Sequence, residues 1–346
     1  MNLAQKPVLI QWGALLLLTT LLVSGLSLIA LPGAFLLGAM IAGVIVALNG
    51  ASISMPNCFY QGAQAMIGTL IATTLTPWVF HSFVEDWALF VGVVLASLVA
   101  STALGYALKI FHVMPGVTGI WGITPGAASA MVIMAEAYGA DMRLVAVMQY
   151  LRVVMVAATA AVCAHFFAEP VVHEVAASFD FTKTLASSAP TLAIMVGGAV
   201  LAAILRVPSG MLFFPLAIGA VLSVSEVVTL HIPRTLQIVA FVALGWKIGL
   251  RFTREVLLYS LSALPKILLS IVVLMVFCAG LALIVAHVLH VDYLTAFLAT
   301  SPGGADAMVS IAAATQINIG FVMSVQVARL IIVILLGPPI ARRLSR

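Results

Sequence analysis

A nearly unbroken succession of long apolar runs constrains this chain more than any other feature of its sequence. A helix needs about 20 apolar residues to cross a bilayer, and ten runs approach that length: 8–30, 31–49, 57–79, 86–110, 142–168, 184–206, 207–225, 235–250, 262–288 and 317–341. Hydrophobic residues fill 64% of the 346 positions and charged residues only 8%, which leaves too little polar surface to cover a soluble body. The sequence therefore predicts an all-α polytopic membrane protein with about ten transmembrane helices and the lipid bilayer as its partner.

Two further apolar stretches, 115–138 and 293–313, are interrupted in the middle. The first contains Thr124-Pro125-Gly126 and the second contains Ser301-Pro302-Gly303-Gly304. Proline removes a backbone donor and clashes with the preceding turn, so a continuous helix facing lipid tolerates such a break poorly. These stretches are predicted to be interrupted or re-entrant segments, added to the ten spans.

The distribution of charge supports this topology, because loops on the cytoplasmic side are enriched in Lys and Arg. With ten crossings and two re-entrant stretches, the basic residues share one side: Lys6, Lys109, Arg143, Arg206, Lys247, Arg251, Arg254, Lys266, Arg342, Arg343 and Arg346. The acidic loop residues then share the other: Glu85, Asp86, Glu169, Glu174, Asp180 and Glu226. Both termini are expected in the cytoplasm.

The sequence also indicates an internal duplication. Residues 124–154 align without a gap with residues 301–331, and eleven of the thirty-one positions are identical. We predict a first membrane repeat over 1–168, with its core at 31–167, and a second over 184–346, with its core at 207–344. Five crossings in each half would turn the second copy upside down, and inverted repeats of this kind are the usual construction of secondary transporters.

The breaks supply the first candidate binding residues. A half-helix is expected to begin after each break, and its free N–H groups favour an anion or a polar ligand. The candidate substrate-binding residues at the breaks are Pro125, Gly126, Ser129, Ser301, Pro302, Gly303 and Gly304. The alternative is purely structural, because Pro-Gly breaks in membrane helices also serve close packing.

A Gln-x-x-Arg pair recurs near the middle of a later apolar run in each half, as Gln149 with Arg152 and as Gln326 with Arg329. A charged residue at that depth is costly and normally faces the protein interior with a partner. Two interpretations stay open. The guanidinium groups bind a carboxylate or other anion of the substrate, or each arginine holds the backbone carbonyls of its interrupted segment.

Asp306 follows the second break, where the first half has Ser129. A carboxylate at membrane depth can bind a proton or Na⁺, so Asp306 is the candidate for ion coupling; it could equally pair with an arginine. We interpret His287, His290 and Asp292 as polar residues at the end of a span, and expect no metal and no cofactor. No catalytic residue is identified, so the chain is not expected to be an enzyme. It also lacks the basic block that nucleic-acid binding needs.

The two duplicated blocks, GITPGAASAMVIMAEAYGADMRLVAVMQYLRVV and LATSPGGADAMVSIAAATQINIGFVMSVQVARL, are preceded by LPGAFLLGAMIAG and VPSGMLFFPLAIGAV. Together they resemble the bacterial AbrB-duplication membrane protein family over nearly the whole chain. The first copy departs from the family pattern by having TPGA in place of SPGG. The labels given to this family, ammonia monooxygenase and regulator of gene expression, imply either oxygen chemistry at a metal or a regulatory role. The resemblance also implies a multi-pass protein of the bacterial inner membrane.

From these observations we expect a secondary transporter of a small anionic or zwitterionic metabolite, with any effect on gene expression being indirect. The alternatives are a membrane metallo-oxidase and a membrane regulator or sensor without flux. The sequence leaves open the substrate, the coupling ion and the oligomeric state, a homo-oligomer included.

Overall fold

The structure is a computed structural model that describes residues 3–74, 87–111, 113–125, 131, 135, 139–167, 181–205, 210–225, 227–228, 230–315, 317–329 and 332–333. Within these ranges the backbone alone is described for residues 89, 181–187 and 305–306. Several residues of the charge-based topology lie outside the described residues: Glu85, Asp86, Glu169, Glu174, Asp180, Arg206, Glu226, Arg342, Arg343 and Arg346.

The described residues form helices and no strand, which confirms the all-α prediction. The helices are α1 (Val8–Leu28), α2 (Ala34–Leu48), α3 (Asn57–Thr74), α5 (Trp87–Ile110), α6 (Thr118–Ile123), α8 (Met142–Phe167), α9 (Phe181–Leu205), α10 (Gly210–Val224), α11 (Arg234–Gly249), α12 (Arg254–Ser260), α13 (Leu264–Leu289), α14 (Tyr293–Thr300) and α15 (Ala305–Ala312). A further apolar helix covers Ile319–Arg329. Each of the ten predicted runs thus contains a helix, and each interrupted stretch contains a short helix that stops at its break.

Five of these helices are long and apolar enough to cross a membrane: Val8–Leu28, Phe90–Ile110, Met142–Phe167, Ser188–Leu205 and Leu264–Leu289. The helices α2 and α10 have 15 residues each, or about 22 Å at 1.5 Å per residue, which is short of a hydrocarbon core of about 30 Å. The membrane class is therefore supported, and the count of ten crossings stays a prediction.

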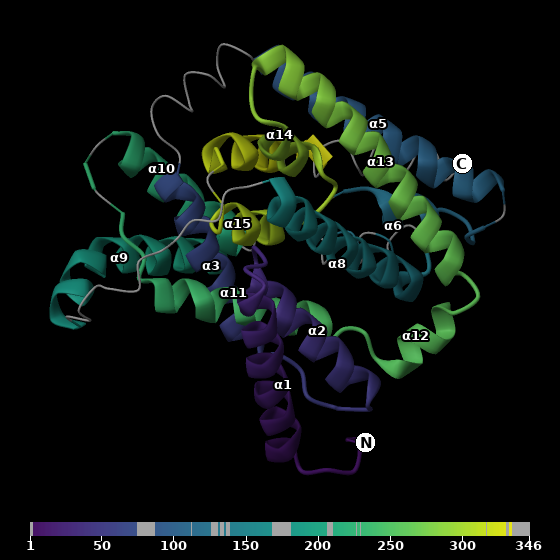
Figure 1. The fold of residues 1–346 in the computed structure, drawn as a ribbon, viewed down its shortest axis with the longest axis horizontal. Coiled ribbons are helices and arrows are strands. Elements are labelled where there is room, and N and C mark those ends of the chain that lie inside the picture. Colours follow the sequence, from purple (N-terminus) through teal and green to yellow (C-terminus); the bar gives the residue numbers. More distant parts are fainter. Residues whose placement is uncertain are drawn as a thin grey trace.

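The helices pack in two groups, and each group draws on both halves of the chain (Figure 1). In the first group α10 packs on α3 and α9, α11 packs on α2 and α3, and α1 packs on α2. In the second group α6 packs between α5 and α8, α14 packs on α13 and α8, and α12 and α15 pack on α8. The main contacts between the groups are made by α15 with α3 and by α2 with α8.

Two glycines permit close helix crossings at matching positions of the first group. A Cβ added to Gly245 of α11 would lie 2.6 Å from the Leu36 carbonyl oxygen of α2, and one added to Gly68 of α3 would overlap the Leu212 carbonyl oxygen of α10. Because backbone approaches backbone directly, no larger residue fits without moving a helix. The two crossings involve corresponding positions of the two halves, since the offset that aligns Pro125 with Pro302 also aligns Gly68 with Gly245.

Helix boundaries recur at this same offset. It aligns the first residue of α3 with that of α11, the first residue of α5 with that of α13, and the last residue of α6 with that of α14. The helices α2 and α10 have equal lengths, and their first residues align when the offset is shortened by one position. The order of helices in the second half of the chain thus follows the order in the first half.

Candidate functional site

The first break is held by two side chains of α8. The helix α6 ends at Ile123, and Thr124 leaves the helical conformation with φ −55° and ψ 121°. Pro125 has no N–H to offer the Trp121 carbonyl four residues earlier. Instead, the side-chain amide of Gln149 donates to the Trp121 carbonyl at 2.8 Å and to the Thr124 carbonyl at 3.0 Å. Gln149 therefore supplies the donor that the proline removes.

Arg152, one turn further along α8, completes this arrangement. Its Nη1 donates to the carbonyls of Ile123 and Thr124, both at 3.0 Å. Its Nη2 donates to Oε1 of Gln149 at 2.9 Å. The guanidinium group thus caps the C-terminal end of α6, where unpaired carbonyls and the negative end of the helix dipole favour a cation.

The second break repeats this chemistry with the helix at 319–329. The Gln326 amide donates to the Leu298 carbonyl at 2.8 Å. The residue four positions after Leu298, whose N–H would bond that carbonyl in a continuous helix, is again a proline, Pro302. Arg329 donates from Nη1 to the Ser301 carbonyl at 2.6 Å and from Nη2 to the Gly303 carbonyl at 2.7 Å. Its Nη2 also donates to Oε1 of Gln326. A Gln–Arg pair therefore caps α14 in the same way that another Gln–Arg pair caps α6.

These contacts bear on the two interpretations of the arginines. In the structure the guanidinium groups donate to the backbone carbonyls at the breaks. This agrees with the interpretation that each arginine holds the carbonyls of its interrupted segment. The side chains of Gln149, Ser301, Arg152, Gln326 and Arg329 are all buried, so a ligand could reach them only after a conformational change.

The two breaks lie close together in space. Arg152 is 1% exposed and Arg329 is 5% exposed, and their guanidinium groups are near enough to repel each other electrostatically. Both also lie within electrostatic range of the buried thiol of Cys278 in α13. The Nε of Arg152 is buried without a hydrogen-bond partner among the described residues. Tertiary packing thus concentrates positive charge where the two interrupted segments meet.

The second break is packed tightly against its neighbours. A Cβ on Gly303 would lie 3.0 Å from Cγ1 of Val156, because α8 passes directly over the break. The Thr300 hydroxyl donates to the Cys278 carbonyl of α13 at 3.1 Å. The break is therefore fixed from two sides, by α8 and by α13.

The other predicted site residues that the structure describes lie at or directly after the breaks. Pro125, Pro302 and Gly303 are buried and Gly304 is partly exposed, all at the breaks. Gly126 and Ser129 lie outside the described residues. Asp306 is the second residue of α15, and its side chain is among those not described, so its role in ion coupling stays a prediction.

No group of three or more His, Cys, Asp or Glu side chains able to hold a metal occurs within the described residues. Asp292 instead caps α14, where its carboxylate accepts from the Thr295 N–H at 2.8 Å and from the Thr295 hydroxyl at 2.6 Å. His290 ends α13 in the left-handed conformation, with φ 52°. Both contribute to the chain reversal between α13 and α14.

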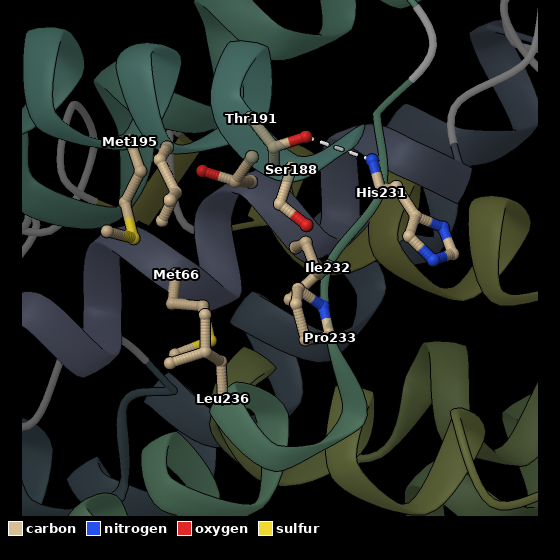
Figure 2. Close-up of a pocket in the computed structure, with 10 residues that line it drawn as sticks. Met66, Ser188, Thr191, Met195, His231, Ile232, Pro233 and Leu236 are labelled. Atoms are coloured by element: carbon tan, nitrogen blue, oxygen red, sulfur yellow. Dashed lines mark hydrogen bonds between the residues drawn. The ribbon is translucent and has the colours of Figure 1, made fainter. Parts of the chain in front are cut away.

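A small cavity lies away from the breaks (Figure 2). It is enclosed by α3, α9, the start of α11 and the segment 231–233, and it has room for about one water molecule. The Thr191 hydroxyl accepts a hydrogen bond from the His231 N–H at 2.9 Å at its edge, and the His231 ring points away from it. None of the predicted site residues lines this cavity.

Sequence reasoning missed the roles of two residues in this region. Cys278 lies in the apolar run 262–288, and its electrostatic proximity to both guanidinium groups depends on packing that no local pattern shows. Asp141 caps α8, because its Oδ1 accepts from the N–H groups of Arg143 at 2.9 Å and Leu144 at 3.2 Å. An Asp directly before an apolar helical run is a recognised start signal that could have identified this cap.

Over the described residues, helices of membrane-spanning length and two short helices that end at a proline, each capped by a buried Gln–Arg pair, define the class of all-helical membrane proteins. The family model described as "Transition state regulatory protein AbrB" matches residues 35–345. The chain therefore belongs to the AbrB family. It is also 40% identical over 343 residues to a protein of Escherichia coli (strain K12) named "Putative regulator AbrB", covering 98% of this chain and 97% of that protein. No solved structure matches the chain.

Proposed function

We propose that this protein is a secondary transporter of a small anionic or zwitterionic metabolite. The observation that carries the proposal is the meeting of two interrupted segments, each capped by a buried Gln–Arg pair, at one place in the fold. Broken helices that meet at the interface of two repeats are the usual binding site of secondary transporters. Two neighbouring guanidinium groups in an apolar interior create a positive potential that favours an anion.

The proposal includes an internal duplication with inverted repeats. Its support is the recurrence of helix boundaries at a nearly constant offset and the pair of matched crossings at Gly68 and Gly245. The second group of helices, which holds both breaks, contacts the first mainly through α15 and α2. A rigid-body displacement of one group against the other would open the buried site to either side in turn, as alternating access requires.

The test is uptake of candidate carboxylates and amino acids into proteoliposomes, with Arg152→Gln and Arg329→Gln beside the unmodified chain. Because both arginines also cap helices, Arg152→Lys is included to keep the charge while losing the guanidinium fork. Arg234→Gln is the control, since it removes the same charge from an exposed position at the start of α11. The folding of each variant is checked by its thermal unfolding without ligand.

We expect uptake of at least one carboxylate or zwitterion. It should be lost in both Arg→Gln variants, partly kept in Arg152→Lys and unchanged in Arg234→Gln. If folded Arg152→Gln and Arg329→Gln proteins transport like the unmodified chain, the arginines are helix caps only and the anion argument fails.

The second candidate is a membrane regulator without flux, which the name of the E. coli relative favours. Thermal unfolding separates it from transport, because a ligand at about 100 times its dissociation constant adds about 2.7 kcal/mol of stability whether or not it is moved. A metabolite that stabilises the protein but is never accumulated by proteoliposomes would support the regulator. Stoichiometric copper or iron in the purified protein would instead support a metallo-oxidase.

A further inference from the structure

The axis of α12 points in a different direction from that of α11, the helix before it, and apolar side chains of α12 are exposed. It is bent by 53° from α11 after a short break and packs on α8. Figure 1 shows it at the edge of the molecule, leading into the start of α13. Leu258 is 55% exposed, Tyr259 50% and Leu261 49%. A short helix that turns aside at the end of an apolar segment, with exposed Leu and Tyr, has the character of an interfacial helix.

Exposed basic residues surround this helix. Arg251 and Arg254 lie before and at its start, Arg143 lies at the start of α8 and Lys266 lies at the start of α13. Together with the exposed side chains of α12 they form what we call the α12 patch. Its four basic residues outnumber its two acidic ones, Asp141 and Glu255, so the patch is positively charged.

Tyrosine rings position two of the guanidinium groups. The guanidinium of Arg143 lies 5.6 Å from the centre of the Tyr259 ring, and that of Arg251 lies 5.9 Å from the centre of the Tyr150 ring. A cation–π contact orients a guanidinium group through its face and leaves its N–H groups able to donate. Both arginines are thus held in place with donors available to a ligand.

The carboxylate of Asp141, two residues before Arg143 in the chain, is already engaged in hydrogen bonds. Asp141 caps α8 with one oxygen, and its Oδ2 accepts from the Tyr259 hydroxyl at 2.5 Å. This hydrogen bond raises the pKa of Tyr259 above its ordinary value, so the hydroxyl stays a neutral donor at physiological pH. The Asp141–Tyr259 bond also ties α12 to α8, which fixes the spacing of the basic residues on the two helices.

We propose that the α12 patch is a binding site for the phosphate group of an anionic phospholipid. Arg143, Arg251 and Arg254 donate to the phosphate oxygens, and Leu258 and Leu261 contact the upper part of the acyl chains. The juxtaposition of positive charge with exposed apolar side chains favours a lipid over a free phosphate, because only a lipid satisfies both. This site is separate from the buried breaks and does not depend on the proposed transport.

The experiment measures thermal unfolding of the detergent-purified full chain during titration with phosphatidylglycerol, phosphatidylcholine or inorganic phosphate. The variants are Arg143→Gln and Arg254→Gln. The matched control is Arg234→Gln, because Arg234 is also exposed and starts α11, whose 16 residues place it about 24 Å from the end that leads to α12. Unchanged unfolding temperatures without lipid show that the variants are folded.

We expect phosphatidylglycerol to stabilise the protein at lower concentrations than phosphatidylcholine. Each patch variant should weaken this effect about fivefold, which corresponds to about 1 kcal/mol per basic residue near a lipid surface, and Arg234→Gln should not. Equal effects of the two lipids, or equal losses in Arg234→Gln, would overturn the proposal. Stabilisation by inorganic phosphate that matches phosphatidylglycerol would show a phosphate site in place of a lipid site.

Discussion

Replacement of Gln326 by Leu isolates the part of the cap that compensates for the proline. Leucine has a similar volume but can neither donate to the Leu298 carbonyl nor accept from Arg329. The Leu298 carbonyl keeps one donor, the Ser301 hydroxyl at 3.1 Å. Loss of a hydrogen bond to a charged group removes about 1.5–3 kcal/mol, and loss of a neutral one about 0.5–1.5 kcal/mol. We therefore expect Gln326→Leu to lower the free energy of unfolding by about 2–4.5 kcal/mol.

The assay is equilibrium unfolding in mixed micelles, with the loss of helix followed by circular dichroism. Gln64→Leu is the matched control, because Gln64 also lies in an apolar helix, is only partly buried, and its amide donates to the Tyr60 hydroxyl of its own helix at 3.0 Å. It should cost no more than about 1 kcal/mol.

A double-mutant cycle with Pro302→Ala tests the physical reason for the effect. Alanine restores an N–H four residues after Leu298, so α14 can extend by a turn and satisfy that carbonyl itself. Gln326→Leu should then cost about 1 kcal/mol less in the Pro302→Ala background than in the unmodified chain. Strictly additive costs, or an effect of Gln326→Leu no larger than that of Gln64→Leu, would refute the idea that the glutamine replaces the donor that the proline removes.

Two further predictions concern packing and coupling. Gly245→Ala should destabilise the protein by about 1–3 kcal/mol, because its Cβ would meet the backbone of α2. Gly280→Ala on α13, where nothing lies within 4 Å, should be neutral or stabilise by up to about 1 kcal/mol; the same unfolding assay ranks the two, and a reversed order would contradict the crossing. Asp306→Asn should abolish the dependence of proteoliposome uptake on a proton or Na⁺ gradient, and uptake that still follows the gradient would eliminate Asp306 as the coupling residue.

Much of the helical framework could be predicted because it depends on local properties of the chain. The predicted run 86–110 is the helix α5 (Trp87–Ile110), and 235–250 is α11 (Arg234–Gly249). The breaks at Pro125 and Pro302 were also predictable, since at each one a proline, which lacks an N–H and has a fixed φ, is followed directly by glycine. The short helix α12 was not predicted, because one short segment between two apolar runs carries too little periodicity to show a helix.

The candidate site was predictable in its residue types and not in its contacts. A buried Gln-x-x-Arg pair indicates a polar partner at membrane depth, but the pattern does not distinguish a substrate from a backbone carbonyl. In the structure the partners are backbone carbonyls, and they lie at the end of the short helix that precedes each Gln–Arg pair in the chain. That pairing depends on how α8 and the helix at 319–329 pass over the two breaks.

The sequence by itself determined the membrane class, the helical secondary structure, the two breaks and the recurrence of the Gln–Arg pair. Each of these depends on hydrophobicity or backbone chemistry within one segment, which acts before distant parts of the chain meet. Only the tertiary structure decided that helices of both halves mix in each group, and that the two guanidinium groups and Cys278 come within electrostatic range of one another. These features depend on which helices approach closely, and that is set by contacts between residues far apart in the chain, such as Gly68 with Leu212 and Gly245 with Leu36.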